Sequence, residues 1–323
     1  MVLSNEQLRG TLSGAVEIAE QNGVLIPYRF GRYLRENVYP ATNRFHPKMT
    51  QSAGVVCRFT TNSHTLAFTY TVETLGAEQS FDVWVNGIFL SHTGCDALAG
   101  RIEVALPDER SEVEIYFPSH REGRIMDVTL DDGADFELPA APKYKILFKG
   151  DSITNGSTTR FTSMGYTHQV ARALNAHIIN QGIGGEEFNP AAMDVDLKEE
   201  LDLIVFAFGT NDWSHAPSHP RMVANVNGFL AGMRDLYPDT KMVMILPLWR
   251  ADSYMQKPTG TFEDACALFR ETATRFGVHV IDGQTLVPHV TEVFADKRLH
   301  PDEFGFQFYA ENLLPHLKAL LEK

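Results

Sequence analysis

The chain has 323 residues, 44% of them hydrophobic and 21% charged, a composition typical of soluble globular proteins and unlike that of disordered, collagen-like or membrane-spanning chains. This length exceeds what one hydrophobic core usually fills, so we expect two domains. The formal net charge of −13 opposes contact with phosphate backbones and anionic lipid, which argues against nucleic acid or a membrane as a partner.

The first part of the chain is predicted to be a β-domain. Its opening residues allow a helix, and from about residue 23 to residue 139 runs such as VVCRFTT and FDVWVNGIFL alternate apolar and polar residues. Several such strands in succession predict a β-sandwich, jelly-roll-like in form. The segment LPAAPKYK, residues 138–145, ends the pattern, so we expect domains at 1–140 and 141–323.

The second part alternates short apolar strands with longer amphipathic segments. Strands are expected at residues 145–148, 177–180, 202–208, 241–246 and 278–282, with helices between them and after the last. This alternation predicts an α/β domain in which a parallel sheet is covered by helices on both faces. Ligands on such sheets bind beyond the carboxyl ends of the strands, so we expect the chemistry there.

Two motifs directly follow the first two of these strands. GDSIT, residues 150–154, places Ser152 where a strand turns into a helix and can expose a nucleophilic hydroxyl, although serine is also a common turn and N-cap residue there. NQGIGGEEF, residues 180–188, has glycines that permit close approach to a ligand and amides that can face an oxyanion, but it is also a pattern of ordinary tight turns. Neither motif fits a P-loop, a GxSxG elbow or a GxGxxG loop.

Two further motifs lie at the third strand and near the C-terminus. FGTNDW, residues 208–213, contains Asn211, whose side-chain amide can donate a hydrogen bond into the same crevice. The stretch ADKRLHPDEF, residues 295–304, contains His300, the usual type of general base near neutral pH.

Together and in this order, the four motifs resemble the four blocks of the SGNH (GDSL-type) hydrolase family. The resemblance covers about residues 145–323 and implies a flavodoxin-like three-layer domain. It implies that Ser152 is the nucleophile and His300 its base, and that the oxyanion hole consists of the backbone amides of Ser152 and Gly185 and the side-chain amide of Asn211.

One position departs from the family pattern. The family has an aspartate three residues before the catalytic histidine, where this chain has Lys297, and Asp296 lies four residues before. Either the turn holds one extra residue and Asp296 still completes a triad, which we favour, or a backbone carbonyl orients His300 in a dyad.

The substrate is expected to be a short-chain ester, chiefly acetyl, because no apolar lid is present near the site. A β-sandwich before an SGNH domain resembles some carbohydrate acetylesterases, which implies a carbohydrate ester and an acyl-enzyme intermediate. Two alternatives stay open: an acyltransferase that uses a specific alcohol, and a non-catalytic carbohydrate-binding protein with a decayed hydrolase domain. Trp213 and Trp249 are expected to line the substrate pocket, or else to pack between the domains.

No cofactor or metal is expected, because HExxH, HxH and paired-cysteine spacings are absent from the sequence. The expected partner is a small-molecule or oligosaccharide ester, and the oligomeric state is left open. The opening residues lack a signal-peptide pattern, so we expect a cytoplasmic protein.

Overall fold

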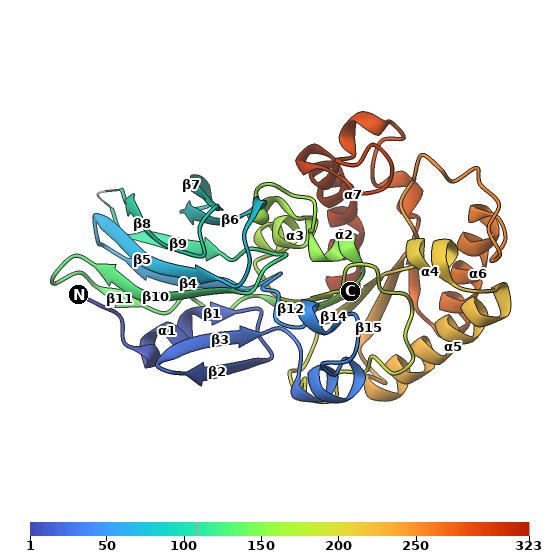
Figure 1. Cartoon of the computed structure of the whole chain (residues 1–323), viewed down its shortest axis with the longest axis horizontal. Coiled ribbons are helices and arrows are strands. Elements are labelled where there is room, and N and C mark those ends of the chain that lie inside the picture. The colour runs from blue at the N-terminus through green and yellow to red at the C-terminus, as the bar shows by residue number, and fades with distance from the viewer. Residues whose placement is uncertain (108, 323) are drawn as a thin grey trace.

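Antiparallel sheets form the first part of the chain and a parallel sheet with helices forms the second (Figure 1). The computed structural model describes residues 1–107 and 109–322. No helix within these ranges is both long and apolar enough to cross a membrane.

The first part is a β-sandwich, as predicted. One sheet has the strand order β1-β4-β9-β6-β7, with β11 paired to β4, and the other has the order β10-β5-β8. Phe59 and Ile115 from the first sheet and Phe68 and Ile125 from the second belong to one buried core. The jelly-roll-like form stays a prediction. The elements are α1 (Asn5–Thr11), β1 (Leu12–Ser13), β2 (Glu17–Gln21), β3 (Val24–Tyr28), η1 (Leu34–Val38), η2 (His46–Lys48), β4 (Val56–Thr61), β5 (Thr65–Val72), β6 (Gly76–Val85), β7 (Ile88–Cys95), β8 (Ala99–Ala105), β9 (Ser111–Tyr116), β10 (Gly123–Leu130) and β11 (Phe136–Glu137).

The second part is a five-stranded parallel sheet of order β13-β12-β14-β15-β16, the flavodoxin-like order, which confirms the predicted fold class. The predicted boundary at residue 140 falls in the segment 138–143, which contains no helix or strand. The elements are β12 (Tyr144–Gly150), α2 (Ser152–Asn155), η3 (Thr162–Met164), α3 (Tyr166–Leu174), β13 (Ala176–Gly182), β14 (Leu203–Ala207), α4 (Thr210–His215), α5 (His219–Leu236), β15 (Lys241–Ile245), α6 (Phe262–Arg275), β16 (His279–Ile281), η4 (Gly283–Thr285), η5 (Thr291–Val293) and α7 (Glu303–Leu321).

The parallel sheet has a separate core on each face. Alternate residues of β12 enter opposite cores, because side chains along a strand point to opposite sides of the sheet. Ile146 and Phe148 pack with helices α3 and α7, whereas Leu147 packs with α5 and α6. With both faces covered, the edge formed by the carboxyl ends of the strands is left for a site.

Candidate active site

Ser152 lies at the carboxyl end of the central strand β12, where the chain turns into the short helix α2. Asp151 caps this helix, and its carboxylate accepts a hydrogen bond from the Ile153 amide at 2.9 Å. The turn is tight: a Cβ on Gly150 would stand 2.1 Å from the Thr154 hydroxyl oxygen. Glycine at position 150 therefore lets the chain turn sharply and present the Ser152 side chain at the sheet edge.

The side chains of Ser152, His300 and Asp296 form one continuous chain of hydrogen bonds. The Ser152 hydroxyl oxygen lies 2.7 Å from His300 Nε2, and His300 Nδ1 lies 2.8 Å from Asp296 Oδ2. With the carboxylate ionised, Nδ1–H donates to it and Nε2 is left to accept the serine proton. The contact that the triad alternative requires is thus present, although Asp296 is four residues from the histidine.

The loop that carries Asp296 accommodates its extra residue through a left-handed backbone at Lys297, whose φ is 56°. The Ala295 amide donates to the His300 carbonyl at 2.8 Å and closes the loop. Asp296 Oδ1 accepts three backbone N–H groups, those of Arg298, Leu299 and His300, at 2.9, 2.9 and 3.1 Å. Burial raises the pKa of Asp296, but these amides and the His300 ring outweigh it and bring the pKa down to about 2.

The loop after β13 lies against the serine. A Cβ on Gly184 would stand 3.8 Å from Ser152 Cβ, and Gly185 has a φ of 82°, which glycine adopts readily. Asn211 is tied to the same loop, since its side-chain amide donates to the Glu186 carbonyl at 3.1 Å and keeps a second N–H. The loop that contains Gly185, to which Asn211 is hydrogen-bonded, therefore lies beside Ser152; the role of both residues as oxyanion donors stays a prediction.

Two buried acids, one in this loop and one bonded to it, were not found from the sequence. The Tyr39 hydroxyl donates to the Glu186 carboxyl, and burial raises the pKa of Glu186 well above its usual range. Asp212 accepts the Phe188 amide at 3.0 Å, and burial raises its pKa to about 8. Burial thus disfavours the charged form of both carboxyls, and Asp212 is mainly uncharged at neutral pH, so it places little negative charge near a developing oxyanion.

The β-sandwich half also reaches this loop, through the segment between β3 and β4. Arg29 is fully buried and donates to the carbonyls of Gln51, Asn180 and Gly182 at 2.8, 2.7 and 2.7 Å. The Lys48 ammonium donates to the Gly184 carbonyl. No sequence motif signalled either residue, because their partners in the second part of the chain lie more than a hundred positions away.

A cleft of about 320 Å³ opens directly over this junction. It is lined by residues from both halves of the chain: Arg44, Phe45, Lys48, Gly184, Gly185 and His215. The glycines are those of the candidate oxyanion loop, whereas the cations and the aromatic ring come from the front segment.

The two tryptophans predicted to line a pocket lie in different surroundings. Trp213 is completely buried, meets the Phe262 ring edge-on at 5.1 Å and donates its indole N–H to the Gly260 carbonyl at 3.1 Å. It packs within the α/β core, so its ring offers no surface to a ligand and the expected pocket position is corrected. Trp249 is partly exposed and stacks on the His289 ring at 5.5 Å.

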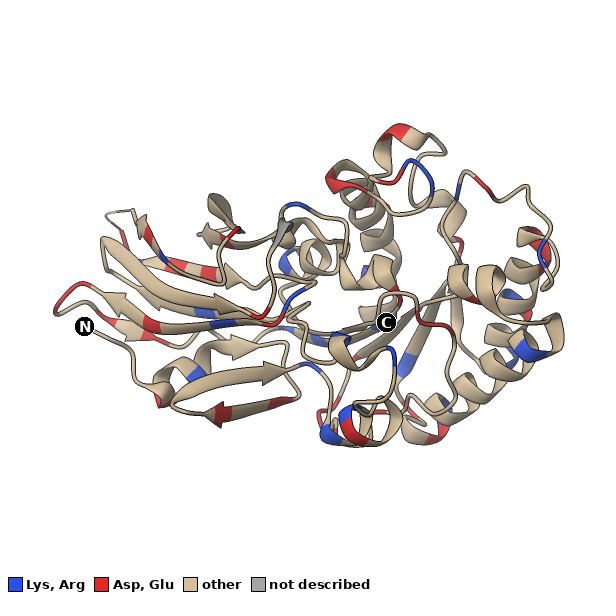
Figure 2. Ribbon diagram, in the orientation of Figure 1, with Lys and Arg blue, Asp and Glu red and all other residues tan. Residues whose placement is uncertain are grey.

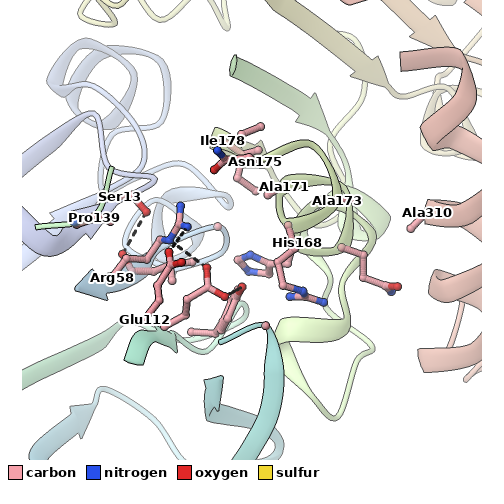
Figure 3. Close-up of a pocket in the computed structure, with 18 of the residues that line it drawn as sticks. Ser13, Arg58, Glu112, Pro139, His168, Ala171, Ala173, Asn175, Ile178 and Ala310 are labelled. Carbon is pink, nitrogen blue, oxygen red and sulfur yellow. Dashed lines mark hydrogen bonds and ion pairs between the residues drawn. The ribbon is translucent and has the colours of Figure 1, made fainter. Parts of the chain in front are cut away.

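A larger cavity lies away from these groups. It has a volume of about 810 Å³ between strands β4 and β9 of the sandwich and helices α3 and α7 (Figure 3). Arg58 there is paired with Glu112 at 2.7 Å, and burial lowers the pKa of His168 to about 3. The cavity reaches Asn175 and Ala176, at the amino end of β13, so it lies at the end of the sheet opposite Ser152.

Comparisons with known proteins agree with this architecture. The family model of GDSL-like lipases and acylhydrolases matches residues 148–308. A salicylyl-acyltransferase from a tetracycline biosynthetic pathway has a TM-score of 0.80 at 22% identity, covering 96% of this chain and 94% of its own. A candidate GDSL-like lipase from Bacteroides ovatus has a TM-score of 0.81 at 19% identity, covering 100% and 98%.

A family two carbohydrate esterase from Clostridium thermocellum, solved with cellohexaose, has a TM-score of 0.63 at 19% identity and covers 84% of this chain and 94% of its own. No curated protein matched the chain. At these identities the likenesses establish a shared fold. The family match over residues 148–308, which contain the four motifs, shows that this chain belongs to the GDSL-like lipase/acylhydrolase (SGNH) family.

Proposed function

We propose that the protein is a serine esterase that hydrolyses short-chain esters, chiefly acetyl esters of a carbohydrate, through an acyl-enzyme intermediate. The observation that supports this most directly is the hydrogen-bond chain from the Ser152 hydroxyl through the His300 ring to the Asp296 carboxylate. In this arrangement a neutral imidazole faces the serine proton, and an ionised carboxylate holds its tautomer.

The proposed reaction has two steps. The Ser152 oxygen attacks the ester carbonyl while His300 Nε2 takes its proton, and the amides of Ser152 and Gly185 with the Asn211 side chain stabilise the oxyanion. The C–O bond to the alcohol breaks as His300 returns the proton to the leaving oxygen. Water then attacks the acyl-enzyme with His300 again as base, which releases the carboxylic acid and regenerates Ser152.

Acyl transfer is the second candidate function, because the structure of the salicylyl-acyltransferase matches more of this chain than that of the carbohydrate esterase does. That structure covers 96% of this chain at a TM-score of 0.80, whereas the carbohydrate esterase covers 84% at 0.63. In a transferase a bound alcohol replaces water in the second step, and the same serine, histidine and oxyanion donors serve. The third alternative, a decayed domain, is disfavoured by the intact contacts among Ser152, His300 and Asp296.

The test is ester hydrolysis by the wild type and by Ser152→Ala. We expect 4-nitrophenyl acetate to be cleaved faster than the butyrate and octanoate, acetate to be released from acetylated xylo- or cello-oligosaccharides, and both activities to vanish in the variant. Adding alcohol acceptors separates the two candidates, because a transferase forms a new ester in preference to free acid. Absence of release from every ester, with or without an acceptor, would contradict the proposal.

A further inference from the structure

The cleft beside the oxyanion loop is lined by positive charges, although the molecule as a whole is negatively charged. The chain has 41 acidic and 28 basic residues, and the acidic ones are spread over both halves (Figure 2). The cleft over Gly184 and Gly185 is nevertheless lined by Arg44 and Lys48 and by no carboxylate. A local positive potential in a negatively charged protein points to a ligand of opposite sign.

An adjoining hollow extends this positive region. It has a volume of about 190 Å³, shares Arg44 with the cleft and adds Arg221. Its two acids are Glu186, whose pKa burial raises well above the usual range, and the half-buried Glu187, whose pKa burial also raises although Arg44 and Arg221 lower it. Burial therefore disfavours the charged form of both acids that lie beside the two arginines.

Lys48 is the cation closest to the oxyanion loop and has no counterion. Across residues 1–107 and 109–322, no carboxylate lies within 4.0 Å of its ammonium group. Burial lowers its pKa first and Arg44 second. A partly buried charge without a partner is costly, and an anionic ligand would remove that cost. Of the three ammonium donors, one is used by the Gly184 carbonyl and two are free.

The position of Lys48 links the charge to the reaction. The point where a Gly184 Cβ would stand lies 3.3 Å from Lys48 Nζ and 3.8 Å from Ser152 Cβ. His215 also lines the cleft. Burial lowers its pKa, and the charged groups that act on it, Arg250, Arg44, Lys257 and Arg298, lower it further. His215 is thus neutral at pH 7, and the surrounding field is positive.

We infer that this cleft binds an anionic oxygen group, a carboxylate or a phosphate, that the ester substrate bears close to its scissile carbonyl. Lys48 is its main contact and Arg44 lies at the mouth, where its guanidinium packs over the Phe45 ring at 4.6 Å. The inference rests on the proposed function, because it assigns the substrate class of the same site. It places substrate selection on the front segment and the chemistry on the α/β domain.

The experiment compares matched charged and neutral esters. To test a carboxylate on the alcohol side of the ester, we compare an O-acetylated methyl glucuronoside with its methyl ester. To test a carboxylate on the acyl side, we compare mono-4-nitrophenyl adipate with its methyl ester. To test a phosphate, we compare 4-acetoxyphenyl phosphate with its dimethyl ester. We expect wild-type kcat/KM to favour the charged member of at least one pair by at least ~10-fold, the order expected when a charged hydrogen bond replaces a neutral contact. The pair that responds identifies which side of the ester, and which anion, the cleft accepts.

Variants then test Lys48 itself. Lys48→Met should lower the charged-to-neutral ratio about 10-fold or more, because the charged hydrogen bond to the anion is lost, and Lys48→Arg should largely keep the ratio. Lys318→Met removes the same charge from an exposed position of the C-terminal helix and should leave the ratio unchanged. Arg44→Gln, at an exposed position, should lower the ratio less and serves if Lys48→Met does not fold.

Three outcomes would overturn the inference, and one of them separates it from the proposed function. No preference in any wild-type pair contradicts it, as does an equal loss on both members in Lys48→Met, which would mean that Lys48 only supports the Gly184 loop. If the wild type cleaves no ester, the proposed function has failed. Calorimetry then compares the binding of methyl glucuronoside with that of methyl glucoside. If the acid binds more tightly to the wild type and Lys48→Met abolishes that difference, the anion site is retained. If the two sugars bind equally, the inference is overturned.

Discussion

The two halves of the molecule contribute to the candidate site in different ways. In the α/β half, Ser152, Gly185 and Asn211 lie in the short helices and the loop that directly follow its parallel strands, so neighbouring residues place each group. The β-sandwich half reaches the site through one segment, with Arg29 bound to β13 carbonyls and Lys48 to the Gly184 carbonyl. Residues close in sequence therefore position the reacting groups, whereas contacts between distant parts of the chain support the cleft and bring positive charge to it.

This difference gives a general expectation for variants. Changes in the α/β loops should lower the rate of the chemical step, and changes in the front segment should alter stability or selectivity. The predictions below test that separation, from the largest expected effect to the smallest.

Ser152→Ala should lower kcat for 4-nitrophenyl acetate by at least ~10³-fold, because the nucleophile is removed while the rest of the site stays in place. Thermal melting should show an unchanged fold, since the side chain is only partly buried. Measurable turnover at the wild-type rate would exclude Ser152 as the nucleophile.

Asp296→Asn should lower kcat by about 10²- to 10⁴-fold, because an amide no longer fixes the His300 tautomer that accepts the serine proton. Near-normal activity would instead favour the dyad. The control is Arg298→Gln. Arg298 lies in the same loop, and its side chain pairs with Asp252, which is outside the triad.

Asp296 also predicts how stability depends on pH. Its folded pKa is about 2, below the usual 3.8, so its carboxylate stabilises the folded state above pH 3.8 and loses that effect as pH falls toward 2. Urea unfolding at pH 6, 4 and 3 should therefore show the deficit of Asp296→Asn shrinking with acid. A deficit that grows toward low pH would contradict the assignment.

Arg29→Met should lower the free energy of unfolding by about 3 kcal/mol or more, because it leaves several buried carbonyls without a donor. Arg32→Met, three residues away and with a side chain 68% exposed, should change stability by less than about 0.5 kcal/mol. Urea unfolding measures both. Equal losses would show that the front segment is not held through Arg29.

Gly185→Ala should lower kcat about 10-fold or more if its amide binds the oxyanion, since a shifted N–H loses transition-state stabilisation. The substitution meets no close atom but is strained by its φ of 82°. Gly133→Ala, at a φ of 79° in open space, has the same strain and should keep full activity. A matching loss of stability in both variants and a loss of activity in Gly185→Ala alone is the expected result.

Lys297→Gly should have the smallest effect, a change in stability of less than about 1 kcal/mol, because relief of the left-handed strain is offset by the greater freedom of glycine in the unfolded chain. Activity should be retained.

Deleting Lys297, by contrast, should lower activity strongly, because the loop between Asp296 and His300 would lose the residue that lets the two side chains meet. Wild-type activity in the deletion variant would refute this account of the loop.

The sequence by itself determined the fold class and the location of the chemistry. The alternation of apolar and polar residues follows from which face of each strand is buried. GDSIT and GTND come directly after strands, so their positions could be inferred from neighbouring residues along the chain. The predicted sandwich and the parallel sheet with its flavodoxin-like order are both present.

Only the tertiary structure decided how Asp296 reaches His300, where the tryptophans lie and what lines the cleft. The left-handed backbone at Lys297 decides the first, and the complete burial of Trp213 removes it from any pocket. Arg29 meets Asn180 across 151 positions, and Lys48 meets Gly184 across 136. Contacts of this range arise where the two halves of the chain pack against each other, and no spacing or periodicity along the chain encodes them.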